Sequence, residues 1–313
     1  MRCQPFIFLV SSALMSIDPR YYTLSGKFSF TGFLGLLLAI PIGTALFGLA
    51  YGYASVYWPF SWFNVISCVI YAGACGFLVS VAGYTAHVRS MALMRWLGSL
   101  TGLFAWYFGW AFWFYAWSDE QLFPWDPRDL ASWIYDLAET GSWTALWVTP
   151  KGIALYLVWI IEAGIIFIVV NFLSTASISG SVYCESCRNW AEPDTLEPPL
   201  EALADEDPLL KALEDGRMDL LEHLRPAAPE ATLALQIQID SCRMCKQVHS
   251  LSLFELRRSF DPNGEASVEK AELLSLLKIK TEDAQHLREF MKSLAPPESN
   301  GPAIVSAKAE QST

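Results

Sequence analysis

The sequence contains four long stretches without a single lysine, arginine or histidine. They cover residues 30–53, 62–84, 98–117 and 153–173. Each has about 20 or more residues, the length that an α-helix needs to cross a hydrocarbon core of about 30 Å. A buried helix of a soluble protein normally keeps a polar face. The absence of basic residues therefore predicts an all-α bundle of four transmembrane helices over residues 30–173.

The chain also lacks the short motifs of common enzyme classes. It has no P-loop, no dinucleotide-binding fingerprint, no nucleophile elbow and no histidine-rich catalytic metal motif. Basic residues are outnumbered at the C-terminal end, where residues 173–313 contain 24 acids against 14 lysines and arginines, a net charge of −10. This balance argues against nucleic acid and anionic lipid headgroups as partners of that half. We therefore expect a protein that is not an enzyme.

Positive charge lies on one side of the predicted bundle. Arg20 and Lys27 precede the first stretch, and Arg89 and Arg95 separate the second from the third. The first link is uncharged and the third is mainly acidic. Because basic loops stay in the cytoplasm, we expect a multi-pass protein of the plasma (inner) membrane with both termini in the cytoplasm.

The N-terminal segment, residues 1–29, is expected on the cytosolic side, and its beginning has two interpretations. Residues 1–15 have a basic start and an apolar run, as a signal peptide does, but no good cleavage site follows. The other interpretation is that translation starts at Met15 and that residues 1–14 are an extension of the reading frame.

Glu162 is the one acidic or basic side chain within the four stretches. An acid near the middle of a bilayer costs about 3 kcal/mol on insertion scales, so it is expected to face protein or water. Counting depth from the outer ends of the stretches places Thr44, Tyr71 and Tyr107 at its level. We expect a structural polar clamp among these residues. The alternative is a small transporter, or a proton- or ion-conducting protein, that uses Glu162.

Small residues repeat every four positions in the first two stretches. Such rows let helices approach closely in lipid, where no hydrophobic force drives their association. They indicate packing within one bundle, and a homo-oligomer interface is the alternative. The rows are Gly35-Ala39-Gly43, Gly48-Gly52 and Ala72-Gly76-Ser80.

Residues 126–138 predict an amphipathic helix in the outer link. Asp126 is a suitable N-cap, and Pro127 suits the first helical position. We expect this helix to cover the outer end of the bundle, with docking of a partner as the alternative. The apolar residues recur at helical spacing, at Leu130, Trp133, Ile134 and Leu137.

Two C-x-x-C pairs follow the last stretch: Cys184 with Cys187, and Cys242 with Cys245. Four thiolates are the tetrahedral set that Zn²⁺ prefers in closed structural sites. Cytoplasmic thiols stay reduced, so a structural disulfide is not expected. The pattern predicts one structural zinc ion per chain. The alternatives are a redox-active C-x-x-C pair and a rubredoxin-like iron site. Among metals, we expect zinc.

Strand-like alternation surrounds the second pair, at residues 233–240 and 249–256. The order of knuckle, strand, knuckle and strand resembles a zinc ribbon over residues 180–258, a likeness of fold. It implies a small α+β cytosolic domain at residues 180–294 that carries the metal. His249 could replace one ligand, but we expect it at the start of a strand.

The 54 residues between the pairs predict a helical hairpin inserted at residues 195–228, after a proline-rich acidic lead-in. Its acids are the candidate partner-binding face. They include Asp205, Glu206, Asp207, Glu214, Asp215 and Asp219.

Residues 261–272 resemble an EF-hand calcium loop only superficially. Such a loop needs glycine at its sixth position, and here Gly264 is at the fourth. We expect a turn followed by a helix capped by Ser267, a last helix from Thr281, and a disordered tail at residues 295–313. The chain as a whole is expected to be a membrane protein whose cytosolic domain binds another protein in assembly, reception or regulation. Thiol redox chemistry and Glu162-dependent transport are the alternatives.

Overall fold

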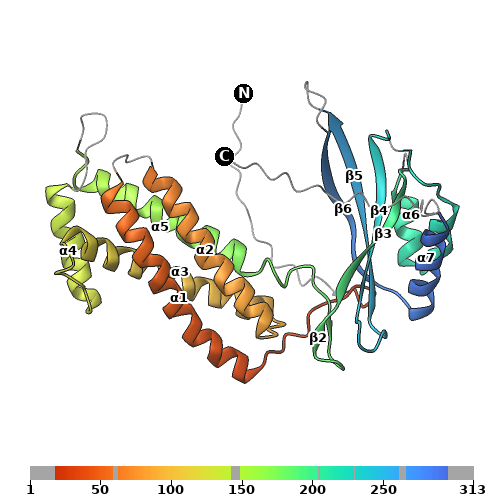
Figure 1. Ribbon diagram of the computed structural model, residues 1–313, viewed down its shortest axis with the longest axis horizontal. Helices are drawn as coiled ribbons and strands as arrows, with labels where there is room; N and C mark the ends of the chain where they lie inside the picture. Colours follow the sequence, from red (N-terminus) through yellow and green to blue (C-terminus); the bar gives the residue numbers. More distant parts are fainter. Residues whose placement is uncertain are drawn as a thin grey trace, which may run out of the picture. The chain divides into compact units, whose positions relative to one another are not determined.

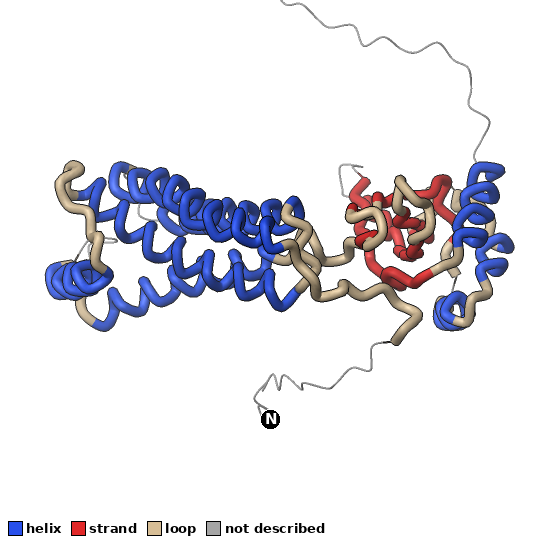
Figure 2. The backbone as a smooth tube through the Cα atoms, turned by 90° about the horizontal axis from the view of Figure 1, so that it is seen from below, coloured by secondary structure: helices blue, strands red, loops and turns tan. Residues whose placement is uncertain are grey.

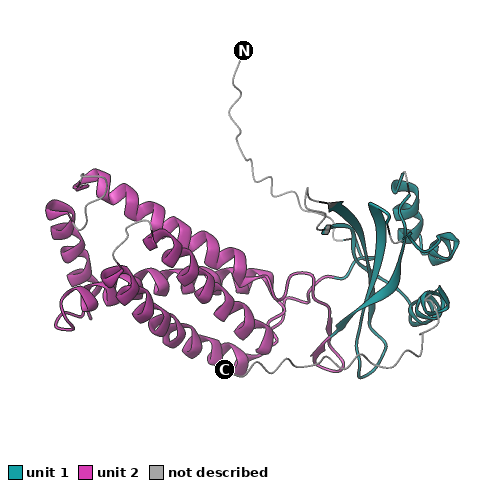
Figure 3. Ribbon diagram, turned by 45° about the horizontal axis from the view of Figure 1, so that its top comes forward, with its two compact units in different colours: residues 1–22, 191–313 teal, residues 23–190 magenta. Residues whose placement is uncertain are grey.

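The computed structural model describes residues 18–58, 63–141, 149–203, 205–228, 230–260 and 266–294. The chain divides into two compact units (Figure 3). We call Thr23–Trp190 the helical unit and Ala191–Thr313 with Met1–Tyr22 the sheet unit. The predicted helical N-terminal half and α+β C-terminal domain are both present. The expected start-site extension and the expected disordered tail lie outside the described residues.

Four long helices lie side by side in the helical unit (Figures 1 and 2). Three of them are long and apolar enough to cross a membrane by length and composition, with mean hydropathy between 2.2 and 2.6: α1 (Phe30–Tyr57), α2 (Phe63–Thr85) and α5 (Ile153–Ser174). The 27-residue α3 (Met91–Trp117) is not among these three. Its tryptophans and tyrosines have amphipathic rings, which favour the membrane–water interface over the hydrocarbon core.

The small residues of α1 and α2 pack inside the helical unit. A Cβ added at Gly52 would lie 2.6 Å from the carbonyl carbon of Phe112 in α3. A Cβ added at Gly76 would lie 2.8 Å from Cβ of Leu173 in α5. These glycines therefore let α3 approach α1 and let α5 approach α2, as expected of packing within one bundle.

The helix α4 (Pro127–Thr140) crosses one end of the bundle (Figure 1). It begins as the sequence predicts, because Asp126 Oδ1 accepts a hydrogen bond of 2.8 Å from the amide of Arg128. Leu130 and Leu137 are buried and pack with Phe114 of α3. The apolar face of α4 therefore covers the end of α3.

The sheet unit is built on four antiparallel strands in the order β3-β4-β5-β6. Short helical elements, including α6 and α7, cover one face of this sheet (Figures 1 and 2). Alternate residues of β4, at 235, 237 and 239, are fully buried in the core beneath them. The strands are β3 (Glu192–Glu201), β4 (Leu233–Ser241), β5 (His249–Phe260) and β6 (Ala266–Lys278). The helical elements are α6 (Asp207–Glu214), the 3-10 helix η1 (Met218–His223) and α7 (Thr281–Leu294).

Two predictions about the sheet unit are wrong. The helix expected after Ser267 is the edge strand β6. The proline-rich lead-in, together with the first residues assigned to the hairpin at 195–228, is the other edge strand, β3. Proline is tolerated there because an edge strand leaves half of its amides outside the ladder. The second helix of the hairpin is present as the short 3-10 helix η1.

The segment before α1 extends the sheet, although the sequence indicated only a cytosolic tail. The amide of Tyr22 donates to the carbonyl of Leu276 at 2.9 Å, and the amide of Lys278 donates to the carbonyl of Arg20 at 2.8 Å. The chain at residues 20–22 therefore forms a short antiparallel bridge alongside the last residues of β6, with Tyr21 opposite Leu277.

Candidate metal centre

The four predicted cysteines come together. Their sulfur atoms all lie within 4.8 Å of one another, and none of the four is in a disulfide. Cys184 and Cys242 are buried, and Cys187 and Cys245 are half-buried. In a tetrahedral site with metal–sulfur bonds of about 2.3 Å, neighbouring sulfurs are about 3.8 Å apart. The donor set and its spacing are therefore compatible with one metal ion.

Both knuckles have the same backbone conformation after their second cysteine. Arg188 follows Cys187 with φ 52°, and Lys246 follows Cys245 with φ 53°. Positive φ is uncommon for residues other than glycine, asparagine and aspartate. In the second knuckle the amide of Lys246 donates to the carbonyl of Cys242 at 2.9 Å, which closes the turn. The recurrence of this turn shows that both pairs are built as tight turns, with their two cysteines on the same side.

Aromatic side chains hold the first knuckle. It is the turn of a hairpin between β1 (Tyr183–Cys184) and β2 (Asn189–Trp190). The Trp190 ring stacks on Tyr84 at 4.7 Å between centroids, and its Nε1 donates to the Tyr84 carbonyl at 2.9 Å. Trp190 also meets Tyr183 edge-on at 5.0 Å. These contacts fix both strands of the hairpin against the C-terminal end of α2.

An ion pair adds to this packing. Arg89 Nη1 lies 2.6 Å from Glu185 Oε2, inside the first C-x-x-C pair, and the guanidinium lies 4.6 Å from the centre of the Tyr183 ring. Ser25 Oγ also donates to Glu185, at 2.6 Å. The hydrogen bond from Ser25 and the charge of Arg89 lower the pKa of Glu185. The sequence predicted a role for Arg89 only in orientation, and the aromatic residues on both sides of the cysteine pair, Tyr183 and Trp190, are the signal for this support.

Backbone hydrogen bonds hold the second knuckle, which joins β4 to β5. Ser241 pairs with His249 at the end of this ladder, and His249 begins β5 as expected. Both ring nitrogens of His249 are engaged, Nε2 with the Lys246 carbonyl and Nδ1 with Ser241 Oγ, each at 2.8 Å. Burial lowers the pKa of His249, which favours the neutral ring, and a neutral ring fits this pattern with one nitrogen donating and the other accepting. His249 therefore supports the knuckle, and the four cysteines remain the candidate ligand set.

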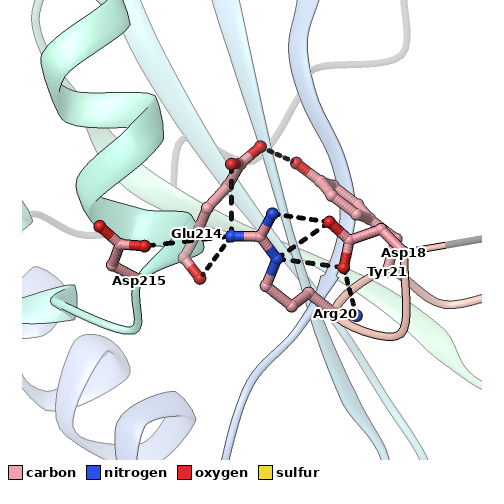
Figure 4. A network of polar contacts seen from close by, with 5 residues as sticks. All are labelled: Asp18, Arg20, Tyr21, Glu214 and Asp215. Carbon is pink, nitrogen blue, oxygen red and sulfur yellow. Dashed lines mark hydrogen bonds and ion pairs between the residues drawn. The ribbon is translucent and has the colours of Figure 1, made fainter.

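Two of the six acidic candidates contact the chain's own N-terminal segment (Figure 4). Tyr21 Oη donates to Glu214 Oε1. Arg20 Nη1 lies 3.5 Å from Glu214 Oε2 and 4.0 Å from Asp215 Oδ1, and its Nη2 lies 2.6 Å from Asp18. Glu214 and Asp215 therefore attach residues 18–21 to the end of α6.

The other four acids have different surroundings. Glu206 is half-buried, and desolvation, followed by the charge of Glu255, raises its pKa. Asp205, Asp207 and Asp219 are exposed at α6 and η1. These three residues are the part of the predicted acidic face that remains at the surface.

Glu162 lies in α5 and accepts a hydrogen bond of 2.5 Å from Tyr51 of α1, a residue that the sequence analysis did not select. The three predicted partners donate to backbone carbonyls. Tyr71 donates to Ala105 at 2.8 Å. Thr44 donates to Ile40 at 2.7 Å, and Tyr107 donates to Pro124 at 2.6 Å. The structure therefore forms a polar clamp at Glu162 with a different tyrosine.

The chain was compared with protein-family models, with curated proteins and with solved structures, and none of them matches.

Proposed function

We propose that this chain is a four-pass protein of the plasma (inner) membrane whose zinc-stabilised cytosolic domain binds a protein partner in assembly, reception or regulation. The observation that carries the proposal is the convergence of four cysteine sulfurs within 4.8 Å. Four thiolates complete the coordination of Zn²⁺ and leave no position for a substrate or a reactive water. The metal would therefore stabilise the fold, and the surface around it would provide the activity.

Topology supports a cytosolic metal site. In this proposal α3 is the fourth span, because it is 27 residues long and packs between α1 and α5. The basic residues Lys27, Arg89 and Arg95 then lie on one side of the membrane with both termini. A reducing cytoplasm keeps all four thiols available for metal.

Charge supports a basic partner. Asp205, Asp207 and Asp219 are exposed on consecutive elements, whereas Glu214 and Asp215 are engaged with Arg20. Complementary charge would steer such a partner to this surface and make the association sensitive to salt. The exposed acids of α6 and η1 are therefore the expected docking surface.

The experiment is crosslinking of the full-length protein in native membranes, followed by identification of partners. We expect one stoichiometric protein partner for the wild type and its loss in the triple variant Asp205→Lys, Asp207→Lys and Asp219→Lys. A matched control is Glu230→Lys, Glu272→Lys and Glu282→Lys, which reverses three exposed acids elsewhere in the sheet unit. Equal crosslinking by both triple variants, or no stoichiometric partner for the wild type, would contradict the proposal.

Metal analysis tests the zinc part separately. We expect one zinc ion per purified chain and cysteines that resist alkylation until a chelator is added. Iron at one per chain would replace zinc in the proposal. Rapid alkylation without a chelator would favour thiol redox chemistry.

A further inference from the structure

A cavity of about 240 Å³ lies in the helical unit, and none of the four cysteines of the candidate metal centre is among its lining residues. Residues of α1, α2, α3, α4 and α5 line it, and Glu162 and Tyr51 are among them. Most of the lining is apolar or aromatic, as in sites that bind small molecules. Four tryptophans contribute to the wall: Trp106, Trp110, Trp113 and Trp159.

One polar atom of the lining has no hydrogen-bond partner among the described residues. Asn64 Oδ1 is buried and unpaired there. Leaving a buried polar atom unpaired is unfavourable. Glu162 has one hydrogen bond in the cavity wall, from Tyr51, and a carboxylate has about four lone-pair sites. The cavity therefore presents unused hydrogen-bonding capacity in an otherwise apolar surrounding.

The chemistry of these atoms selects the charge of the ligand. A carboxylate oxygen and an amide oxygen only accept hydrogen bonds, and a serine hydroxyl accepts as well as donates. Among the described residues, the lining contains no lysine, arginine or histidine. Tryptophan rings attract cations, and the charge of Glu162 repels anions. A ligand that matches this lining is a cation with several N–H donors.

The rim and the volume of the cavity indicate the size and polarity of the rest of the ligand. Val65 of α2 and Ile161 of α5 line the cavity and are 58% and 64% exposed. Both belong to helices that are apolar enough to span a membrane, so this rim would face lipid. The volume is below the roughly 300 Å³ at which common ligand pockets begin. The ligand is therefore small, with an apolar body.

We propose that this cavity binds a small lipophilic primary ammonium. Its N–H groups donate to the Glu162 carboxylate and to Asn64 Oδ1, and its apolar body lies among the tryptophans. An ion pair in an apolar site is favourable only when the remaining polar atoms are also hydrogen-bonded. The unpaired Oδ1 of Asn64 supplies such a partner for the ammonium.

The test uses the full-length protein in lipid nanodiscs and 3-phenylpropylammonium as the probe, with tryptophan fluorescence as the readout and empty nanodiscs as the blank. Two matched ligands are 3-phenylpropanol, which lacks the charge, and the trimethylammonium analogue, which lacks the N–H groups. We expect the wild type to bind the primary ammonium at least tenfold more tightly than either analogue. Glu162→Gln should lose at least tenfold in affinity for the ammonium and keep its affinity for the alcohol. Glu139→Gln, at an exposed position of α4, should behave as wild type.

Equal affinity of the wild type for the ammonium and the alcohol would overturn the proposal, whatever the variants do. A folded Glu162→Gln that binds the ammonium as wild type does would overturn it as well. If Glu162→Gln does not fold, the test rests on Asn64→Leu and on the affinities of the wild type for the ammonium and its two analogues. It should reduce the preference for the primary over the trimethylated ammonium at least threefold, and an unchanged preference would count against the assigned contacts.

Discussion

The two C-x-x-C knuckles share one turn conformation but are held by different kinds of structure. The second joins β4 to β5, which are paired without interruption from Leu233 with Arg257 to Ser241 with His249. The first closes a hairpin of two-residue strands. Its support comes from side chains, chiefly Trp190 on Tyr84 and Arg89 with Glu185.

This difference indicates how the metal site forms. Ladder hydrogen bonds involve the backbone and depend little on any one side chain, so we expect the second knuckle to be formed before metal binds. The first knuckle depends on a few side-chain contacts, so the metal would complete its order. Metal binding and folding would then be coupled mainly at the first knuckle.

Removal of a ligand from either knuckle should have the largest effect. Structural zinc sites contribute on the order of 10 kcal/mol to folding, so Cys187→Ser and Cys245→Ser should each lower the metal content from one per chain to none. Metal analysis checks this, with Cys75→Ser of α2 as a control that keeps its metal. The comparison also predicts that Cys184 and Cys187 in Cys245→Ser are alkylated faster than Cys242 and Cys245 in Cys187→Ser. Equal rates would show that the two knuckles are equally ordered without metal.

Truncation of Trp190 should come next. Its side chain is 5% exposed, and truncating a buried tryptophan to alanine costs about 3 to 5 kcal/mol. Because this stability is lost from the first knuckle, Trp190→Ala should release its metal to a chelator much faster than the wild type does. Trp125→Ala is the matched control, since that ring is 84% exposed. A release rate like that of the control would mean that the metal alone holds the first knuckle.

Loss of the ion pair should have a smaller effect. Arg89 is largely buried but Glu185 is 44% exposed, so solvent screening limits the pair to about 1 kcal/mol, with a similar amount from the Tyr183 ring. Arg89→Gln should therefore accelerate metal release less than Trp190→Ala does. The exposed Arg95→Gln should leave the rate unchanged. If Arg89→Gln accelerates metal release more than Trp190→Ala does, the electrostatic contact stabilises the first knuckle more than the aromatic contact.

Features encoded by neighbouring residues could be predicted from the sequence, and features that depend on contacts between distant residues could not. The apolar stretches, the strands β4 and β5, and the cysteine pairs are local patterns, and each appears where it was expected. The strand β6 contains alanine, glutamate, lysine and leucine, which favour a helix, but pairing with β5 decides its conformation. The support of Trp190 by Tyr84 joins positions 106 residues apart, and no local pattern reveals such a contact.

The partner of Glu162 was missed for a simpler reason. The first span was assigned an outer end at residue 53, whereas α1 continues to Tyr57. Four residues amount to about 6 Å of helix, so the corrected end moves the expected level from Thr44 to Gly48, about one helical turn from Tyr51. Helix ends are the least certain part of a sequence prediction, and this error was carried into the choice of contacts.

Substitution of the residues with positive φ should have the smallest effect and should test the one feature that both knuckles share. The left-handed conformation costs a residue with a Cβ about 1 to 2 kcal/mol, and a β-branched side chain is the least tolerant. Arg188→Val and Lys246→Val should therefore each lower the melting temperature, while Arg188→Gly and Lys246→Gly should be neutral or slightly stabilising. Thermal unfolding of the metal-bound protein gives the comparison. If the first knuckle is the weaker one, Arg188→Val should also accelerate metal release more than Lys246→Val, because the β4–β5 ladder holds the second turn in place. The reverse order would show that the ladder strains the turn that it supports.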